Sequence, residues 1–404
     1  MSTLKVNKLR DTAGSADAIT LDPNGGAVLA GVTTVTSVKV GAAVTITESG
    51  IEASGIGITC ANINGTQIGG RRNIIINGDF RIAQRATSAT AEGYQTVDRF
   101  TYDAGGEDET ITQAQVDVAS GTTPYTLGFR KAFKITNGNQ TSGAGAGDRL
   151  FTTYAFEAQD LATSGWNYTS SSSYVTLSFW VKSSVAQTFH GYLSTADGTQ
   201  QGYSFETGSL TANTWTKVTK TIPGNSNITI NNDTGSGLSM IIGVYWGTNF
   251  TDAGNTMNQW AAYSSTSRMP DNITTWYTTN DATFEFTGVQ LEVGDTATSF
   301  EHRSFGDELT RCSRYLQIFH VPTSDSKRAS NITATVHGAG NGVYLNVAFT
   351  HPMRAAPSVT VDGAFGGNVF TGSWSGDTLS SFAAEYETDA LTCLLYTSPS
   401  PRDS

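Results

Sequence analysis

The chain has 404 residues, enough for two to four domains of roughly 100 to 200 residues each. Only 15% of the residues are charged, while glycine occurs 43 times and threonine and serine are abundant. Solvated helical faces need charged, straight-chain residues, so this composition argues against a helical enzyme. Threonine, valine and aromatic residues suit a pleated surface, and Gly, Asn and Ser turn one strand into the next. The composition therefore predicts an all-β protein.

The formal net charge is −11, with 24 basic against 35 acidic residues. A negative chain without a cluster of Lys or Arg lacks the electrostatic footprint of a nucleic-acid-binding protein. No run approaches the roughly 18 apolar residues of a membrane span, and the first ten residues lack a signal-peptide core. Cys60, Cys312 and Cys393 are spread too widely to indicate a disulfide framework or a metal site. We expect neither nucleic-acid binding nor membrane insertion.

Residues 1–70 are interpreted as an N-terminal attachment segment followed by a Gly/Thr-rich β-repeat shaft. Short β-rich runs alternate here with glycine, for example Val-Thr-Thr-Val-Thr-Ser-Val-Lys-Val before Gly41. The runs hold almost no aromatic residues, so one copy has too little apolar area to offset the entropy of ordering it. Such a segment is stabilised by stacking repeats or by pairing with other chains, as in a trimeric fibre shaft. The alternative is a flexible Thr/Gly linker.

Residues 71–303 differ in kind, because six of the seven tryptophans fall within them. Strand-like runs separated by turn signals occupy residues 73–76, 128–136, 150–157, 174–183, 189–194, 214–222, 238–246 and 282–293. In residues 174–183, apolar positions alternate with polar ones and Trp180 falls on the wetter face. About eight such strands over this length predict a two-sheet jelly-roll β-sandwich with long loops.

Residues 304–317 are predicted to form a short helical neck. Asp307 is the expected N-cap, and Leu309, Cys312 and Leu316 fall on one helical face at spacings of three and four. Residues 318–392 are predicted to form a second, truncated β domain, with strands at 315–321, 332–337, 343–350 and 357–361.

Residues 393–404 break with the preceding composition. The run Cys-Leu-Leu-Tyr-Thr-Ser-Pro-Ser-Pro-Arg-Asp from Cys393 resembles the translation of a common transposon-type sequencing-library adapter. We interpret it as an artefact that is excluded from fold reasoning, and we expect the natural chain to continue differently after residue 392. The alternative is a Pro-rich tail.

The sequence contains no nucleophile elbow, H-E-x-x-H pair, C-x-x-C or P-loop, and we expect no enzymatic activity. A glycan-cleaving enzyme would need two carboxylates facing a cleft. The candidate pairs for that alternative are Glu157 with Asp160 and Glu107 with Glu109.

Two loops combine aromatic rings with amide and carboxylate groups. The apolar face of a sugar packs on an aromatic ring, while its hydroxyls bond to Asn, Asp, Gln and Arg. A long irregular loop rich in aromatics is poorly explained by core packing alone. The candidate glycan-binding residues are Trp166 and Tyr168 in the first loop and Trp246, Asn258, Gln259, Trp260, Tyr263, Asp271, Trp276 and Tyr277 in the second. For any single tryptophan, a role in anchoring the core or a loop is the competing interpretation.

Four motifs in order give the middle domain a resemblance to the galactose-binding-like jelly rolls used as carbohydrate-binding modules. They are Ile76-Asn-Gly-Asp-Phe80, Val175-Thr-Leu-Ser-Phe-Trp-Val-Lys182, Trp215-Thr-Lys-Val-Thr-Lys-Thr-Ile222 and Phe284-Glu-Phe-Thr-Gly-Val-Gln-Leu-Glu292. The resemblance implies a structural calcium bound near the first and last motifs. Because Arg81 and Thr287-Gly288 stand where acids are usual, only Asp79 and Glu285 remain as candidate calcium ligands. Apart from this calcium, we expect no cofactor.

Taken whole, residues 1–320 more closely resemble tail-fibre proteins of marine bacteriophages. The matching motifs are Ser2-Thr-Leu-Lys-Val-Asn7, Asn73-Ile-Ile-Ile-Asn-Gly-Asp-Phe80, Ala83-Gln-Arg85, Val97-Asp-Arg-Phe100, Phe286-Thr-Gly-Val-Gln-Leu-Glu-Val-Gly294, Phe300-Glu-His-Arg303 and Glu308-Leu-Thr-Arg-Cys-Ser-Arg-Tyr315. The resemblance implies a homotrimeric fibre that attaches to tail or baseplate proteins of the virion and touches the host with its distal β domains.

These observations together predict a non-enzymatic receptor-binding fibre of the virion tail, assembled in the host cytoplasm. Its expected ligand is a bacterial surface polysaccharide or lipopolysaccharide. The alternatives are a tailspike-type polysaccharide depolymerase and a secreted carbohydrate-binding adhesin.

Overall fold

The computed structural model describes residues 72–318 and 349–356 with their side chains, and elsewhere only the course of individual strands. Contacts divide the chain into two units, Met1–Ala61 and Asn62–Ser404. No helix among the described residues is long and apolar enough to cross a membrane. The remaining residues of the predicted shaft and of the predicted C-terminal domain lie outside the described ones.

The first unit holds short antiparallel strands in two three-stranded sheets, β1-β2-β3 and β4-β5-β6. Their bounds are β1 (Lys8–Arg10), β2 (Asp17–Leu21), β3 (Ala27–Leu29), β4 (Ser37–Val40), β5 (Val44–Thr47) and β6 (Gly50–Ala53). A two-stranded sheet at the start of the second unit pairs β7 (Asn62–Ile63) with β8 (Thr66–Gln67). Strands therefore occur where the shaft is predicted, while a core shared by three chains stays a prediction.

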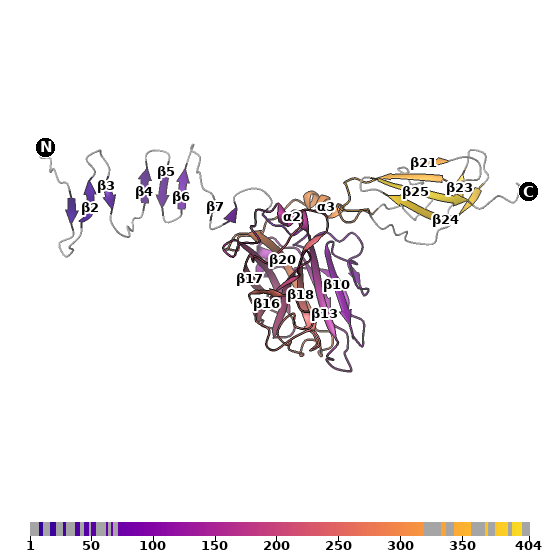
Figure 1. Ribbon diagram of the computed structural model, residues 1–404, viewed down its shortest axis with the longest axis horizontal. Coiled ribbons are helices and arrows are strands. Elements are labelled where there is room, and N and C mark those ends of the chain that lie inside the picture. The colour runs from indigo at the N-terminus through magenta and orange to yellow at the C-terminus, as the bar shows by residue number, and fades with distance from the viewer. Residues whose placement is uncertain are drawn as a thin grey trace, which may run out of the picture. The chain divides into compact units, whose positions relative to one another are not determined.

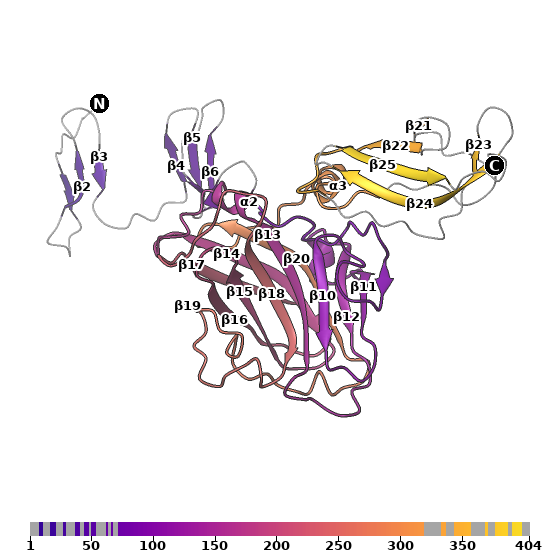
Figure 2. The same cartoon turned by 45° about the vertical axis from the view of Figure 1, so that its right-hand side comes forward.

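Two six-stranded antiparallel sheets face each other in the domain of residues 72–318 (Figures 1 and 2). Sheet I has the order β10 (Phe100–Gly105), β13 (Arg149–Glu157), β18 (Ser236–Trp246), β15 (Thr188–Thr195), β16 (Gln201–Ser209) and β19 (Trp260–Ala262). Sheet II has the order β17 (Thr216–Pro223), β14 (Tyr174–Ser183), β20 (Thr283–Val293), β12 (Lys131–Thr136), β11 (Thr112–Asp117) and β9 (Ser88–Ala89). The prediction of an all-β jelly-roll sandwich is confirmed.

Alternating side chains build the core between the sheets. In β14, Val175, Leu177, Phe179 and Val181 are fully buried, whereas Trp180 is partly exposed as predicted. The two sheets enclose one aromatic cluster in which Phe80 meets Phe100 at 4.7 Å and Phe286 at 5.0 Å between ring centroids, both edge-on.

Most of the predicted strands occur, but the one at residues 73–76 is wrong. This segment is buried yet irregular, and its backbone bonds go to single partners, such as Ile74 N donating to Leu291 O at 2.9 Å. The Asn73 side chain accepts from Ile75 N and Leu291 N in place of a ladder. The strand predicted from residue 315 is also wrong through residue 318, because the chain forms a turn at residue 315 and is irregular over residues 316–318.

The predicted neck is helix α3 (Phe305–Ser313), shorter than expected and packed on the sandwich. Its N-cap is Ser304, whose Oγ accepts from Asp307 N at 3.1 Å, so the expected cap at Asp307 is wrong. Cys312 is fully buried beside Ile76 and Ile82, with Leu309 packed against them. Two shorter helices are α1 (Thr123–Thr126) and α2 (Ala158–Ala162).

The C-terminal strands form one five-stranded sheet in the order β21-β22-β25-β24-β23. Their bounds are β21 (Thr333–Val336), β22 (Val343–Ala348), β23 (Asn368–Phe370), β24 (Gly376–Tyr386) and β25 (Ala390–Thr397). Strand β25 crosses the boundary at residue 393, and the interpretation of residues 393–404 as an adapter stays a prediction. The prediction of strand 357–361 lies outside the described residues.

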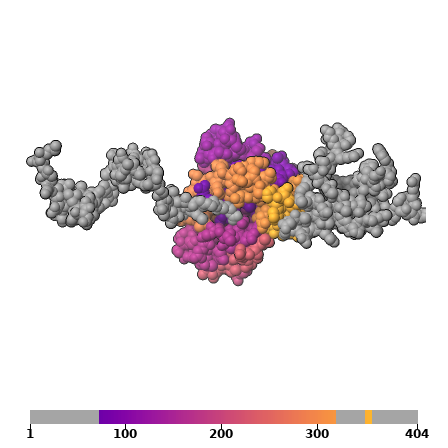
Figure 3. Space-filling model, turned by 90° about the horizontal axis from the view of Figure 1, so that it is seen from above, coloured from indigo at the N-terminus to yellow at the C-terminus, as the bar shows by residue number. Residues whose placement is uncertain are grey.

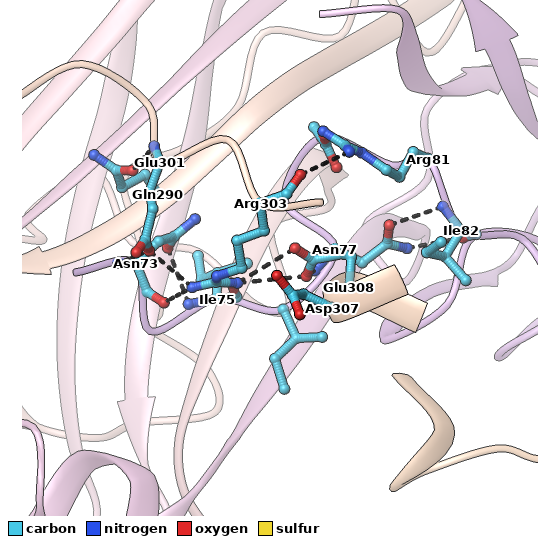
Figure 4. A network of polar contacts seen from close by, with 12 residues as sticks. Asn73, Ile75, Asn77, Arg81, Ile82, Gln290, Glu301, Arg303, Asp307 and Glu308 are labelled. Atoms are coloured by element: carbon cyan, nitrogen blue, oxygen red, sulfur yellow. Dashed lines mark hydrogen bonds and ion pairs between the residues drawn. The ribbon is translucent and has the colours of Figure 1, made fainter. Parts of the chain in front are cut away.

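A buried polar network joins the opening segment of the sandwich, residues 73–82, to the chain that follows β20 and to α3 (Figure 4). The Arg303 guanidinium donates to Ile75 O at 3.0 Å and also to Asn73 O, and it pairs with Glu301 at 3.0 Å and with Glu308. Glu308 in turn accepts from Asn77 N. Gly78 lies so close to β20 that a Cβ there would collide with the Val289 carbonyl. In Figure 3, the orange atoms around residue 300 spread across the middle of the face shown.

Glu308→Ala is expected to lower the free energy of unfolding by about 3–5 kcal/mol, because it leaves Arg303 with a broken buried ion pair and Asn77 N without an acceptor. Denaturant unfolding of the full chain measures this. Asp307→Ala, one residue earlier and exposed, is the matched control and is expected to cost no more than about 1 kcal/mol. Equal losses in the two variants would show that the network does not stabilise the sandwich.

Candidate functional site

Four of the rings expected to bind glycan lie in the interior. Trp276, Tyr277, Trp246 and Trp166 expose 0%, 1%, 2% and 3% of their surface. A ring must present its face to solvent to stack on a sugar, so the assignment of these four residues to a ligand groove is wrong. The fold buries them because a large ring removes more apolar area from water than any other side chain.

The contacts of these rings define structural roles. Trp276 Nε1 donates to Thr283 O at 3.0 Å, and Tyr277 stacks on Tyr245 with centroids 4.4 Å apart. Trp166 Nε1 donates to Ser173 O at 3.3 Å.

Trp260 and Tyr168, also candidates, are partly buried and held by backbone carbonyls. Trp260 Nε1 donates to Pro223 O at 2.7 Å and its ring packs against Tyr203. Tyr168 Oη donates to Ile230 O at 3.2 Å. Both rings pack against the main core. Their polar atoms are therefore already used within the domain.

Residues 247–275 contribute to a second apolar cluster on the outer face of sheet I. Met240 and Ile242 of β18 point into the core between the sheets, so Ile241 between them points outward. Ile241 packs there with Tyr192 of β15 and with Met269 from the loop. Further members of this cluster are Trp246, Phe151, Phe250 and Tyr263. The aromatic residues of the loop are thus divided between the core and this outer cluster.

A small concavity of about 30 Å³ lies beside the outer cluster, between the loop and strands β15, β16 and β19. Its lining includes Tyr192, Ser204, Gln259, Tyr263 and Arg268, with Asn255 and several small residues between them. The volume suits a water molecule or one hydroxyl group and is too small for a sugar ring. A saccharide would therefore lie across the mouth and insert a single polar group.

Arg268 is the charged residue of this lining. Its guanidinium lies 4.6 Å from the Trp246 ring centroid and 5.0 Å from that of Phe250, and Nε donates to Tyr263 Oη at 2.8 Å. Nη1 is buried and has no hydrogen-bond partner. An unsatisfied buried donor costs about 1–3 kcal/mol or more, so an oxygen atom that reached it would be stabilised.

Tyr192 and His190, which lie on this face, are neutral at physiological pH. Burial raises the pKa of Tyr192, and the nearby Tyr263 acts in the same direction, so the phenol keeps its proton. Burial lowers the pKa of His190 on β15, whose Nδ1 lies 3.4 Å from Asn272 Nδ2. The concavity thus offers neutral hydrogen-bonding groups and the single cation of Arg268.

The remaining candidates divide between the concavity and the loop that frames it. Gln259 and Tyr263 line it, and their role in binding a ligand stays a prediction. Asn258 is exposed next to Gln259, and its backbone N donates to Ser204 O at 2.8 Å. Asp271 is exposed, and its Oδ1 accepts from Thr251 Oγ1 at 2.6 Å, which makes it a loop-fixing residue.

The two candidate calcium ligands are each neutralised by a cation of the chain. Asp79 forms an ion pair with Arg81, and Glu285 pairs with Lys182 at 2.8 Å. Within residues 72–318 and 349–356, no group of three or more His, Cys, Asp or Glu is placed to hold a metal ion. These residues do not fit the calcium site that the resemblance implies, because Arg81 brings a positive charge to the place of an acid.

One member of each acidic pair considered for glycan cleavage serves structural contacts. Glu157 accepts from Arg314 Nη2 at 2.6 Å and from Tyr315 Oη at 2.7 Å, and these hydrogen bonds lower its pKa against the opposing effect of burial. Glu109 accepts from Asn139 N at 2.6 Å. A general acid needs a raised pKa, and Glu157 shows the opposite shift.

The lining residues missed by sequence reasoning include Tyr192 and Arg268. Arg268 is the one basic residue between Trp246 and Tyr277, and that isolation was a usable signal. Tyr192 is remote from the loop in sequence and carries no such signal. It reaches the loop only because β15 pairs with β16 and β16 pairs with β19.

No protein-family model and no curated protein sequence matches the chain. Among solved structures, it is similar to the enzymatically active domain of tailspike protein 4 from bacteriophage CBA120, with 10% identity and a TM-score of 0.29 over 55% of this chain and 21% of that one. It is also similar to the N-terminal cellulose-binding domain of Cellulomonas fimi β-1,4-glucanase C, with 9% identity and a TM-score of 0.25 over 54% of this chain and 99% of that one.

A third similar structure is the family 11 carbohydrate-binding module from Clostridium thermocellum, with 11% identity and a TM-score of 0.24 over 53% of this chain and 98% of that one. Identities and TM-scores this low carry no inference about a ligand. The strands and contacts themselves define the class: an antiparallel β-sandwich with a small polar concavity framed by aromatic rings.

Trp276→Ala is expected to lower the free energy of unfolding by about 3–5 kcal/mol, because it empties a fully buried site. Denaturant unfolding followed by circular dichroism measures the loss. Trp215→Ala, at a partly exposed tryptophan next to β17, is the matched control and is expected to cost less. A Trp276→Ala chain as stable as the unmutated one would contradict the assignment of this ring to the core.

Proposed function

We propose that the chain is a non-enzymatic receptor-binding fibre of a bacteriophage tail, and that its sandwich binds bacterial surface glycan across the concavity on sheet I. The observation that carries the glycan assignment is the unpartnered Nη1 of Arg268 in a lining that also holds Gln259 and Tyr263. Sugar hydroxyls both donate and accept, so one hydroxyl would satisfy the guanidinium and the amide together.

The small volume of the concavity implies weak binding at each site. A saccharide that inserts one hydroxyl and rests on partly exposed Tyr263 buries little surface. A fibre presents several copies of the site to a repetitive polymer, so avidity supplies the affinity that a single site lacks. Lipopolysaccharide and capsular polysaccharide are the ligands that fit this mode.

The fibre assignment rests on the tail-fibre motifs at the two ends of the sandwich. Arg303 of the Phe300–Arg303 motif contacts Asn73 and Ile75 of the Asn73–Phe80 motif, and Glu308 of the Glu308–Tyr315 motif contacts Asn77, also in the Asn73–Phe80 motif. Motifs far apart in the sequence thus build one structural unit, which supports treating them as a single signature. The proposal places the chain in the virion tail as a homotrimer attached to tail or baseplate proteins.

Tyr263→Ala and Gln259→Ala are expected to lower binding to the polysaccharides that the unmutated chain recognises at least fivefold, because both remove lining groups. An array of purified bacterial lipopolysaccharides and capsular polysaccharides measures binding. Tyr94→Ala, at an exposed tyrosine outside the lining, is the matched control and is expected to bind normally.

Wild-type binding by both lining variants, or an array without any bound glycan, would contradict the site. Assaying the same polysaccharides for new reducing ends tests the alternative of a depolymerase. Their appearance would replace the non-enzymatic proposal.

The full chain is expected to sediment with three times its monomer mass of 42.8 kDa. The expectation follows from the small apolar content of residues 1–70, which one copy alone cannot order. Sedimentation equilibrium at several concentrations measures the mass. A single-chain mass at every concentration would contradict the fibre shaft, while leaving the glycan site untouched.

A further inference from the structure

A second hollow in the sandwich, far larger than the concavity on sheet I, lies where the opening segment, the end of α1 and the start of α3 meet. Its volume is about 400 Å³, within the range of roughly 300–1,000 Å³ typical of small-molecule sites. Its lining consists of Asp79, Arg81, Gly128, Arg130, Lys131 and Phe305. None of these residues lines the concavity on sheet I. The two hollows are therefore separate sites.

The lining is basic in an acidic protein. It holds three cations and one carboxylate, which leaves a net charge of +2 at pH 7, whereas the whole chain carries −11. The one carboxylate, Asp79, is already paired with Arg81. A cleft lined by one sign of charge focuses the field and concentrates counter-ions of the opposite sign. The site thus selects an anion.

The cations differ in how firmly they are held. Arg81 is fixed by Asp79 and by Arg303 O, to which Nη1 donates at 2.9 Å (Figure 4). Lys131 pairs at 2.6 Å with Asp117, whose side chain is 82% exposed, and such a surface pair is weak enough to exchange for a ligand. Arg81 supplies fixed charge, and Lys131 supplies a cation that an incoming anion captures.

Arg130 keeps donors for bidentate binding. Its guanidinium stacks on Tyr125 at 3.9 Å, and Nη1 donates to Tyr125 O at 2.8 Å and to Phe129 O at 2.9 Å. Its described hydrogen bonds use only Nη1, so Nε and Nη2 keep the paired donors that match a carboxylate or a phosphate.

Phe305 adds an apolar face to this basic lining. It is the first residue of α3, and 58% of its surface is exposed, more than any other large apolar side chain in the described part of the chain. The C–H face of a sugar ring packs on such a ring. An inorganic anion would gain nothing from it.

From this combination we propose that the cleft between Arg81, Arg130, Lys131 and Phe305 binds an acidic saccharide, a sugar ring that carries a carboxylate or a phosphate group. The anion lies between Arg130 and Lys131, and the ring lies on Phe305. This site goes beyond the glycan concavity on sheet I, since it recognises charge and lies on different elements.

The test measures binding of four probes to the full chain by isothermal titration calorimetry in 20 mM salt: trigalacturonate, glucose 6-phosphate, inorganic phosphate and maltotriose. The double variant Arg130→Gln/Lys131→Gln is expected to weaken binding of whichever acidic sugar the chain prefers at least tenfold. Arg149→Gln/Lys217→Gln removes the same charge from other strands, and it is expected to change this binding less than twofold. Raising the salt to 300 mM weakens binding for the unmutated chain.

Phe305→Ala distinguishes a sugar site from a bare anion site. It is expected to weaken the acidic sugar at least threefold and to leave inorganic phosphate unchanged. The preference between trigalacturonate and glucose 6-phosphate tells a carboxylate-bearing sugar from a phosphorylated one. Thermal unfolding followed by circular dichroism verifies that each variant is folded.

The proposal is overturned if neither acidic sugar binds at millimolar concentration, if both double variants weaken binding equally, or if inorganic phosphate binds as tightly as the sugars. Tyr263→Ala must leave acidic-sugar binding unchanged, since that residue lines the other site. The two failures are therefore distinguishable. If the glycan concavity is wrong, Tyr263→Ala binds normally on the polysaccharide array. If the acidic-saccharide cleft is wrong, Arg130→Gln/Lys131→Gln does not selectively weaken binding of the acidic sugar.

Discussion

The buried guanidinium of Arg303 is the constraint on which the closure of the sandwich depends. Its side chain is only 7% exposed, and a buried charge is tolerated only where opposite charge and hydrogen-bond acceptors surround it. Glu301 and Glu308 supply the charge, and the carbonyls of Asn73 and Ile75 supply the acceptors. Because these partners come from both ends of the domain, the network fixes the opening segment against the start of α3. The same network holds Arg81, whose side chain donates to Arg303 O. It also positions Phe305, which follows Arg303 by two residues.

The aromatic residues satisfy two different demands. Phe80, Phe100 and Phe286 fill the space between the sheets in edge-on contacts. Trp246 and Tyr192 instead cover the outer face of sheet I, where Arg268 lies against the rings. Rings on the outer face leave little room, so the concavity beside them holds only one small group. The same packing that stabilises the loop thus limits what the site can bind.

The sequence allowed the strands to be predicted where apolar and polar residues alternate, as in β14, whose bounds agree with the prediction. It did not indicate β11 or β16, because Gln, Asp and Gly within them are poor strand formers that only pairing with neighbours stabilises. For the site, composition pointed to the loop that contributes to the lining of the concavity, but it cannot tell whether a ring faces inward, and ligand binding there stays a prediction. Trp276 and Tyr263 occur in the same loop, and the fold buries one and leaves the other at the surface.

The two hollows use positive charge in opposite ways. Arg268 is enclosed by aromatic rings whose π-faces attract its cation, and the role proposed for it toward a ligand is that of a directional donor. Arg130 and Lys131 stand at the surface of the larger cleft, where their charge attracts anions over a distance set by salt. The binding proposed for the first hollow therefore depends on hydroxyl geometry and is expected to be nearly independent of ionic strength. The binding proposed for the second depends on charge, so we expect the ionic strength of the medium to decide which of the two would dominate the contact with a mixed polysaccharide.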